Sequence, residues 1–194
     1  ATLPPTRRAR PGEAWLVTGG VGQDAIVASI HAAAESVGVT DCRSMPAADL
    51  AAALAARSRV SALTRVLVLA PAEAGATAPL EVAVADCLAA LRTAAQAVDR
   101  GSTALRVSVL TVGGGEATAA PAANPAARAV VALGRTLFWE ARAAAGTGVN
   151  LPVSVAEDAL APILAAALGC DEYAVALTAC GAGGGVRARP FLGT

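Results

Sequence analysis

A short apolar run that ends in clustered glycines constrains this chain more than any other stretch. Residues 15–20 read WLVTGG, and a segment with helical periodicity follows from residue 23. Residues 20–25 fit the pattern G-x-G-x-x-G/A, with alanine in the last place. The first glycine permits a tight turn, the second lets backbone approach a pyrophosphate, and a small last residue lets the helix pack closely on the strand. The stretch predicts a β-turn-α unit that binds a dinucleotide; the alternative is a glycine turn without a ligand.

The dinucleotide hypothesis assigns specific binding residues. Thr18, Gly20 and Gly22 lie around the turn where the phosphates would bind. Asp41 follows at roughly the 20-residue spacing at which an acidic side chain meets a ribose hydroxyl. Arg43, close to Asp41, either suits a 2′-phosphate or is a solvated loop charge.

Strands and helices alternate along the rest of the chain. Strand-like segments are predicted at 13–18, 39–42, 65–70, 105–112, 148–152 and 173–178, and helices at 23–37, 47–56, 80–98, 126–144 and 156–168. This order predicts an α/β fold: a Rossmann-like, doubly wound, mostly parallel sheet with helices on both faces. Residues 1–12, rich in proline and arginine, are predicted to be a tail or linker before a single domain over 13–194.

Apolar residues at helical spacing define the expected inner faces of three helices. In the first helix they are Ile26, Ile30, Ala33 and Val37. His31 lies beside them and is expected to be a surface or boundary residue. The helix over 80–98 has Leu80, Val84, Leu88, Leu91, Ala95 and Val98, and the helix over 126–144 has Val130, Leu133, Leu137 and Ala141. Hydrophobic residues make up 55% of the chain and aromatic residues only 3%, so we expect tight contacts between small side chains.

Charge and composition argue against several classes of partner. The formal net charge is zero, which disfavours nucleic acid or an anionic membrane as the main partner. Charges interrupt every apolar stretch before the roughly 18 residues that a membrane span needs. Arg7, Arg8 and Arg10 precede no long apolar run, so no signal peptide is expected and the predicted location is cytoplasmic.

Cysteine and histidine spacing does not predict a metal site. Cys42, Cys87, Cys170 and Cys180 form no C-x-x-C pair, and His31 is the only histidine. We therefore expect reduced thiols and assign no metal ligand.

These segments resemble the short-chain dehydrogenase/reductase family, and within it the ketoreductases of fatty-acid and polyketide synthesis, over about residues 12–190. Residues 10–20 are similar to the segment that enters a polyketide-synthase ketoreductase. Residues 150–152 (NLP) resemble the asparagine-bearing sixth strand, and the glycines after Cys180 resemble the closing strand and its turn. Residues 124–129 and 133–135 also resemble the non-catalytic, structural half of such ketoreductases.

The resemblance implies a carbonyl reduction by NAD(P)H, with a tyrosine as proton donor, a lysine that lowers its pKa and a serine that positions the carbonyl oxygen. This chain departs from that pattern: all 15 basic residues are arginine, and no serine occurs from residue 110 through 151. The only tyrosine, Tyr173, precedes the last predicted strand and is flanked by Asp171 and Glu172. Thr111 either substitutes weakly for the serine or simply closes a strand.

The position of the phosphates is altered as well. Gln23 and Asp24 open the first helix, and an aspartate there competes with pyrophosphate for the positive end of the helix dipole. We therefore expect no cofactor and assign no catalytic residue.

The leading hypothesis is a non-catalytic ketoreductase-like domain or subunit that stabilises or positions a catalytic ketoreductase. The resemblance implies association as a dimer, through the helices over 80–99 and 126–144. Two alternatives stay open: an active NADPH-dependent β-ketoacyl thioester reductase with unorthodox catalytic groups, and a module that binds an acyl carrier protein or an acyl chain at the carboxyl ends of the strands.

Overall fold

A computed structural model describes residues 7–20, 23–57, 62–71, 80–100, 104–112, 125–140, 145–151, 157–168, 175–180 and 185–190. The strands are β1 (Ala14–Gly19), β2 (Asp41–Ser44), β3 (Thr64–Leu69), β4 (Leu105–Val112), β5 (Ala145–Leu151), β6 (Val175–Cys180) and β7 (Gly185–Pro190). The helices are α1 (Asp24–Val37), α2 (Ala47–Arg57), α3 (Leu80–Asp99), α4 (Pro125–Glu140) and α5 (Glu157–Leu168). The predicted doubly wound α/β fold is confirmed.

The strands form one sheet in the order β2-β1-β3-β4-β5-β6-β7. The first six strands are parallel, and β7, which only the family resemblance implied, pairs antiparallel with β6. In the Rossmann order 3-2-1-4-5-6 a third strand lies outside the second. Here the chain returns after β2 to the other side of β1. The topological switch point therefore lies between β1 and β3, and β2 is at the edge.

The second strand begins two residues later than predicted, because Val39 is part of the motif that ends α1. Gly38 has a φ of 89°, and its backbone N–H bonds back to Glu35. The N–H of Val39 donates to the carbonyl of Ala34 at 2.9 Å, which completes a Schellman motif. Val39 thus caps the helix, and the strand starts at Asp41.

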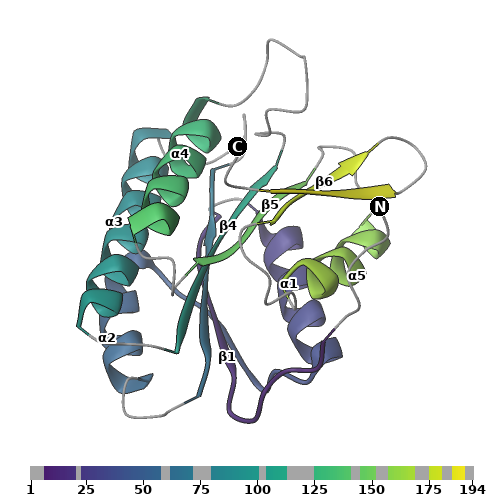
Figure 1. Ribbon diagram of the computed structural model, residues 1–194, viewed down its shortest axis with the longest axis horizontal. Helices are drawn as coiled ribbons and strands as arrows, with labels where there is room; N and C mark the ends of the chain where they lie inside the picture. The colour runs from purple at the N-terminus through teal and green to yellow at the C-terminus, as the bar shows by residue number, and fades with distance from the viewer. Residues whose placement is uncertain are drawn as a thin grey trace.

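Helices cover the two faces of the sheet unequally (Figure 1). The helices α2, α3 and α4 lie on one side, and α1 and α5 lie on the other. Side chains alternate along β1 accordingly: Leu16 packs in the cluster with α2, α3 and α4, whereas Trp15 and Val17 pack in the cluster with α1 and α5.

The inner face of α3 differs from the one that periodicity predicted. Its buried residues are mostly small: Ala83, Cys87, Ala90, Leu91 and Ala94. Leu80 and Leu88, expected inside, are 45% and 37% exposed. Leu91 is buried as predicted, and Ala95 and Val98 pack against the core. The prediction was wrong for Leu80 and Leu88 because it ranked residues by hydrophobicity, whereas small side chains let the helix approach its neighbours more closely.

A small residue also determines which face of α4 packs on the sheet. A Cβ at Gly134 would come within 2.7 Å of a methyl group of Val109 in β4, so the backbone of the helix nearly touches the sheet. Val130 and Leu137 are buried as predicted, but Leu133 is 38% exposed. The predicted contact of Ala141 lies outside the described residues.

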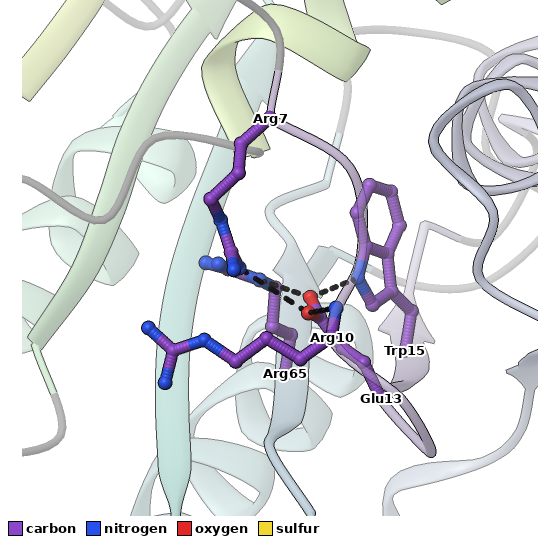
Figure 2. Close-up of polar contacts among 5 residues, drawn as sticks. All are labelled: Arg7, Arg10, Glu13, Trp15 and Arg65. Carbon is purple, nitrogen blue, oxygen red and sulfur yellow. Dashed lines mark hydrogen bonds and ion pairs between the residues drawn. The ribbon is translucent and has the colours of Figure 1, made fainter.

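The carboxylate of Glu13, just before β1, joins four other residues (Figure 2). Its Oε1 accepts hydrogen bonds from Arg65 Nε at 2.8 Å and Trp15 Nε1 at 3.1 Å. Its Oε2 accepts the backbone N–H of Arg10 at 3.0 Å and pairs with Arg7 Nη2 at 3.3 Å. Glu13 and Arg65 are 3% and 1% exposed. Part of the segment predicted as a tail, residues 7–12, is therefore bound to the domain; residues 1–6 lie outside the described part.

These contacts determine the charge of Glu13. Burial alone would raise the pKa of its carboxyl group. The hydrogen bonds from the Arg10 backbone, Arg65 and Trp15, together with the charge of Arg65, outweigh burial and hold the pKa below its ordinary value. The carboxylate is thus ionised in the folded protein at neutral pH.

Two adjacent glycines close the end of β1 against β3. Gly19 and Gly20 have φ angles of 83° and 73°, which side chains other than glycine rarely adopt. A Cβ at Gly19 would overlap the carbonyl oxygen of Leu69, and one at Gly20 would come within 2.7 Å of a methyl group of Leu69. Both positions need glycine for packing, whether or not a ligand binds.

The first prediction concerns the Glu13 ion pair. Glu13→Gln keeps the shape of the side chain but removes the negative charge that the buried guanidinium of Arg65 contacts. We expect a loss of about 3–5 kcal/mol in the free energy of unfolding at pH 7, measured by denaturant titration. The added substitution Arg65→Met is expected to recover part of that loss.

The same variant tests the pH dependence. Because the folded-state pKa of Glu13 is lowered, its stabilisation is present above the unfolded pKa of about 4.3 and is lost as the pH falls through the lower folded value. The stability difference between the wild type and Glu13→Gln should therefore shrink below about pH 4. Equal stabilities at pH 7 would contradict the role of this pair.

The second prediction compares two glycines with similar φ angles. A Cβ at Gly38 has no atom within 4 Å, so Gly38→Ala should cost only the strain of the left-handed backbone, about 1–2 kcal/mol. Gly19→Ala adds the overlap with Leu69 and should cost roughly 1–3 kcal/mol more, by the same unfolding measurement. A similar cost for both would show that the contact with β3 is unimportant.

Candidate functional site

Ligands of open parallel sheets bind outside the carboxyl ends of the strands, at the switch point. In this chain that point lies between the ends of β1 and β3. Gly19 and Gly20 come from β1 and its turn, and Ala70 and Pro71 follow β3. The candidate site is therefore the place at which the sequence predicted a dinucleotide.

The side chain of Gln23 crosses this place. Gln23 is 6% exposed, and its Nε2 donates to the carbonyl oxygen of Ala70 at 2.8 Å. Its backbone N–H bonds to the carbonyl of Gly20 at 2.8 Å, and its own carbonyl accepts the first N–H groups of α1, from Ile26 and Val27. A residue at the start of α1 thus ties the turn after β1 to the end of β3. Sequence reasoning missed this link, because any residue satisfies the pattern at that position.

Of the other residues predicted to bind the phosphates, two pack inside the fold and one lies outside the described residues. Gly20 packs on Leu69, and Gly22 is outside the described residues. Thr18 is 1% exposed, and its hydroxyl has no hydrogen-bond partner within the part of the chain that the structure describes. By strand alternation Thr18 lies on the same face as Leu16, toward α3. Asp24 is exposed in the first turn of α1, where its charge complements the helix dipole.

The structure does not bring Asp41 to this site. Asp41 is the first residue of β2 and pairs with Ala14, the first residue of β1, at the amino edge of the sheet. Thr18 lies four residues further along β1, roughly 13 Å away. Asp41 Oδ1 contacts Arg43 Nε at 2.6 Å, and Oδ2 contacts Arg57 Nη1 at 3.2 Å. Asp41 therefore lies at the amino end of its strand and is paired with two arginines, whereas Arg43 lies nearer the carboxyl end, beside Leu16 of β1.

A second polar group lies at the carboxyl end of the neighbouring strands. Thr111 of β4 pairs with Asn150 of β5 in the sheet. The Thr111 hydroxyl is directed to Asn150 Oδ1 at 2.9 Å, and Thr111 is 2% exposed. Since the amide oxygen can only accept, Thr111 donates this hydrogen bond. The Thr111 hydroxyl, which was the candidate substitute for the serine, is thus buried and bonded within the sheet.

Cys87 lies beside the junction of β1 and β3 but is buried, and His31 and Cys42 lie elsewhere, by the start of β2. Cys87 is buried on α3, its Sγ lies 3.1 Å from the carbonyl oxygen of Leu69, and burial together with Asp86 raises its pKa to about 12. His31 is half-buried and contacts Ser44 Oγ at 3.0 Å. The described residues contain no group of three acidic, cysteine or histidine side chains that could hold a metal ion. None of the described helices is long and apolar enough to cross a membrane.

This arrangement does not fit a dinucleotide held in the manner that the glycine pattern predicts. Gln23 lies at the predicted position of the pyrophosphate, Asp24 follows it in the first turn of α1, and Asp41 lies at the amino end of the neighbouring strand. What the site provides instead is a closed connection between β1, α1 and β3.

Comparison with solved structures relates this geometry to known proteins. The chain is similar to a C2-type ketoreductase from a modular polyketide synthase, with 26% identity and a TM-score of 0.58 over 95% of this chain and 42% of that one. It is also similar to A-type ketoreductases from a modular polyketide synthase, with 25% identity and a TM-score of 0.59 over 97% and 39%. The first ketoreductase of the tylosin polyketide synthase matches at 23% identity and a TM-score of 0.57 over 95% and 40%.

Comparisons of sequence give no further assignment, because no protein family and no curated protein matches the chain. The chain covers about two fifths of the length of these solved structures. The suspected resemblance is thus confirmed in three dimensions: this chain has the Rossmann-like α/β fold of polyketide-synthase ketoreductases.

Proposed function

We propose that this chain is a non-catalytic, ketoreductase-like structural domain or subunit of a polyketide or fatty-acid synthesis system, which stabilises or positions a catalytic reductase. The observation that carries the proposal is the hydrogen bond from the buried Thr111 to Asn150. The Thr111 hydroxyl is the candidate substitute for the substrate-orienting serine, and this hydrogen bond engages it in joining β4 to β5.

The chemistry of carbonyl reduction supports the same conclusion. Hydride transfer leaves negative charge on the carbonyl oxygen, and the loss of one positioned donor typically costs about 10²–10³ in rate. A tyrosine donor has an unperturbed pKa of about 10 and needs a nearby cation to work near neutral pH. The chain has no lysine, and the carboxylates of Asp171 and Glu172 flank its only tyrosine.

We propose no cofactor for this chain. The link from Gln23 to Ala70 and the acidic residue that follows it both disfavour a pyrophosphate at the start of α1. NADP would be required only by the alternative of an active reductase.

The partner surface that we propose lies on α3 and α4, which are side by side on one face of the sheet (Figure 1). The large hydrophobic residues that are exposed in the described structure all come from these two helices: Leu80, Val82, Leu88 and Leu133. Small residues occupy the buried side of these helices, so the large apolar side chains face outward. Such an apolar surface is suited to contact with another protein. A catalytic ketoreductase, as a further domain or a separate subunit, is the proposed occupant.

The third prediction tests nucleotide binding. NADPH up to millimolar concentration should give no saturable change in fluorescence and no increase in melting temperature, because a ligand that binds only the folded state would raise it. The fluorescence and melting measurements should be made on the same sample, with an intact ketoreductase as the positive control. Saturable binding with turnover of a β-ketoacyl thioester would instead establish the active-reductase alternative.

The fourth prediction tests the α3–α4 surface. A catalytic ketoreductase from the same gene cluster, with its tyrosine and lysine intact, should bind the chain and gain thermal stability. Leu88→Asp and Leu133→Asp should each weaken binding at least about tenfold, since they place a charge in an apolar interface, and should leave the melting temperature of the chain itself nearly unchanged.

Ala28→Asp is the matched control, because Ala28 is exposed on α1, on the opposite face of the sheet. Equal binding by all three variants would reject this surface. Affinity for an acyl carrier protein that depends on its acyl chain, without any binding of the reductase, would favour the acyl-binding alternative.

A further inference from the structure

The edge strand β2 has an open side. Among the described strands it pairs only with β1. The N–H of Met45, just after β2, donates to the carbonyl of Val17 at 2.9 Å, so Met45 directs its backbone toward β1. Because the backbone groups of a strand alternate in direction, those of Arg43 and Asp41 also face β1, and those of Cys42 and Ser44 face outward. The outer edge can therefore accept another strand.

A hollow lies beside this edge. Its volume is about 550 Å³, and it is formed by the second half of α1 and the start of β2: His31, Ala32, Glu35, Gly38, Val39, Thr40 and Cys42. An open strand next to a helix-lined hollow is the arrangement in which strand addition is found, since main-chain bonds supply affinity and the hollow receives side chains.

We propose that a second copy of this chain adds its β2 to this edge, antiparallel and about a twofold axis. An isologous contact of this kind requires a self-complementary surface. The side chains of β2 provide it, because Asp41 and Arg43 have opposite charges and lie on the same face of the strand. The Arg43 side chain is 70% exposed, although its Nε already contacts Asp41, which also contacts Arg57 of the same chain.

Charge selects one register. If the axis passes through Cys42, then Cys42 lies opposite its own copy, and Asp41 and Arg43 each lie opposite the other residue of the second copy. Shifting the axis by one residue, to Arg43, places two arginines opposite each other. Opposite charges directly across two antiparallel strands stabilise the pair and like charges destabilise it, so the first register is favoured.

The backbone geometry agrees with this register. Cys42 and its copy would form a hydrogen-bonded pair, with their Cα atoms about 5.5 Å apart. Ser44 would pair with Thr40 of the second copy in the same way on each side. The two α1 helices would then come together above the axis and cover both hollows, while α3 and α4 stay free. The inference is thus independent of the reductase partner proposed above.

The test begins with sedimentation velocity of the full chain over micromolar to millimolar concentrations. We expect a reversible monomer–dimer equilibrium. Arg43→Asp sets like charges across both pairs and should weaken the dimer roughly tenfold or more, and Arg43→Ala should weaken it less. Arg8→Asp makes the same change of charge at another exposed residue and is the matched control. Melting temperatures show whether each variant stays folded.

Cross-linking through Cys42 supplies a second readout that needs no variant of the charges. In a chain with Cys170→Ser and Cys180→Ser, a short bis-maleimide should join two copies, and the further change Cys42→Ser should abolish the product while Cys87, which is buried, remains. Burial and the neighbouring Asp41 raise the pKa of Cys42 to about 11, so the reaction needs mildly alkaline buffer and long incubation. A monomer at millimolar concentration, a dimer indifferent to Arg43→Asp, or cross-linking unaffected by Cys42→Ser would each overturn the proposal.

Discussion

The packing of the turn after β1 against Leu69 is the contact on which the rest of the molecule depends. At the switch point of an open parallel sheet the two central strands usually leave a crevice for a ligand. Here Gly19 and Gly20 bring the backbone of β1 against Leu69, and Gln23 bonds across to Ala70. The same glycines that would admit a pyrophosphate instead admit the neighbouring strand. Glycine is thus required at this turn for packing, whether or not a ligand binds.

Buried polar side chains also connect elements at the two opposite ends of the strands. At the amino edge, the Glu13–Arg65 ion pair binds residues 7–12 and fixes the start of β1 and β3. At the carboxyl edge, Thr111 and Asn150 bond to each other between β4 and β5. In both places the polar side chains join elements of the fold.

The sequence predicted the order of strands and helices well, because period and glycine or proline punctuation are local properties. The limits of β4 agree fully with the predicted strand at 105–112, and most other elements agree within a few residues. The place of Asp41 was not predictable by counting residues: β2 starts late because Val39 caps α1, and the aspartate therefore lies at the amino edge. The bond from Gln23 to Ala70 joins positions 47 residues apart, so no local pattern indicates it. The exposure of the leucines of α3 and α4 could have been predicted from the alanines and the glycine on the other side of each helix. Ranking residues by hydrophobicity hid that pattern.

The small side chains of the core also determine how this protein tolerates change. Ala90, Ala94 and Ala127 are fully buried where α3 and α4 meet the sheet. Truncation, the usual way to damage a core, has little to remove at such positions. Enlargement is the damaging direction, because one added methyl group pushes a whole helix outward. Sequence drift in such a domain is thus restricted chiefly by side-chain volume at its helix–sheet contacts, and substitutions elsewhere can accumulate while the fold persists.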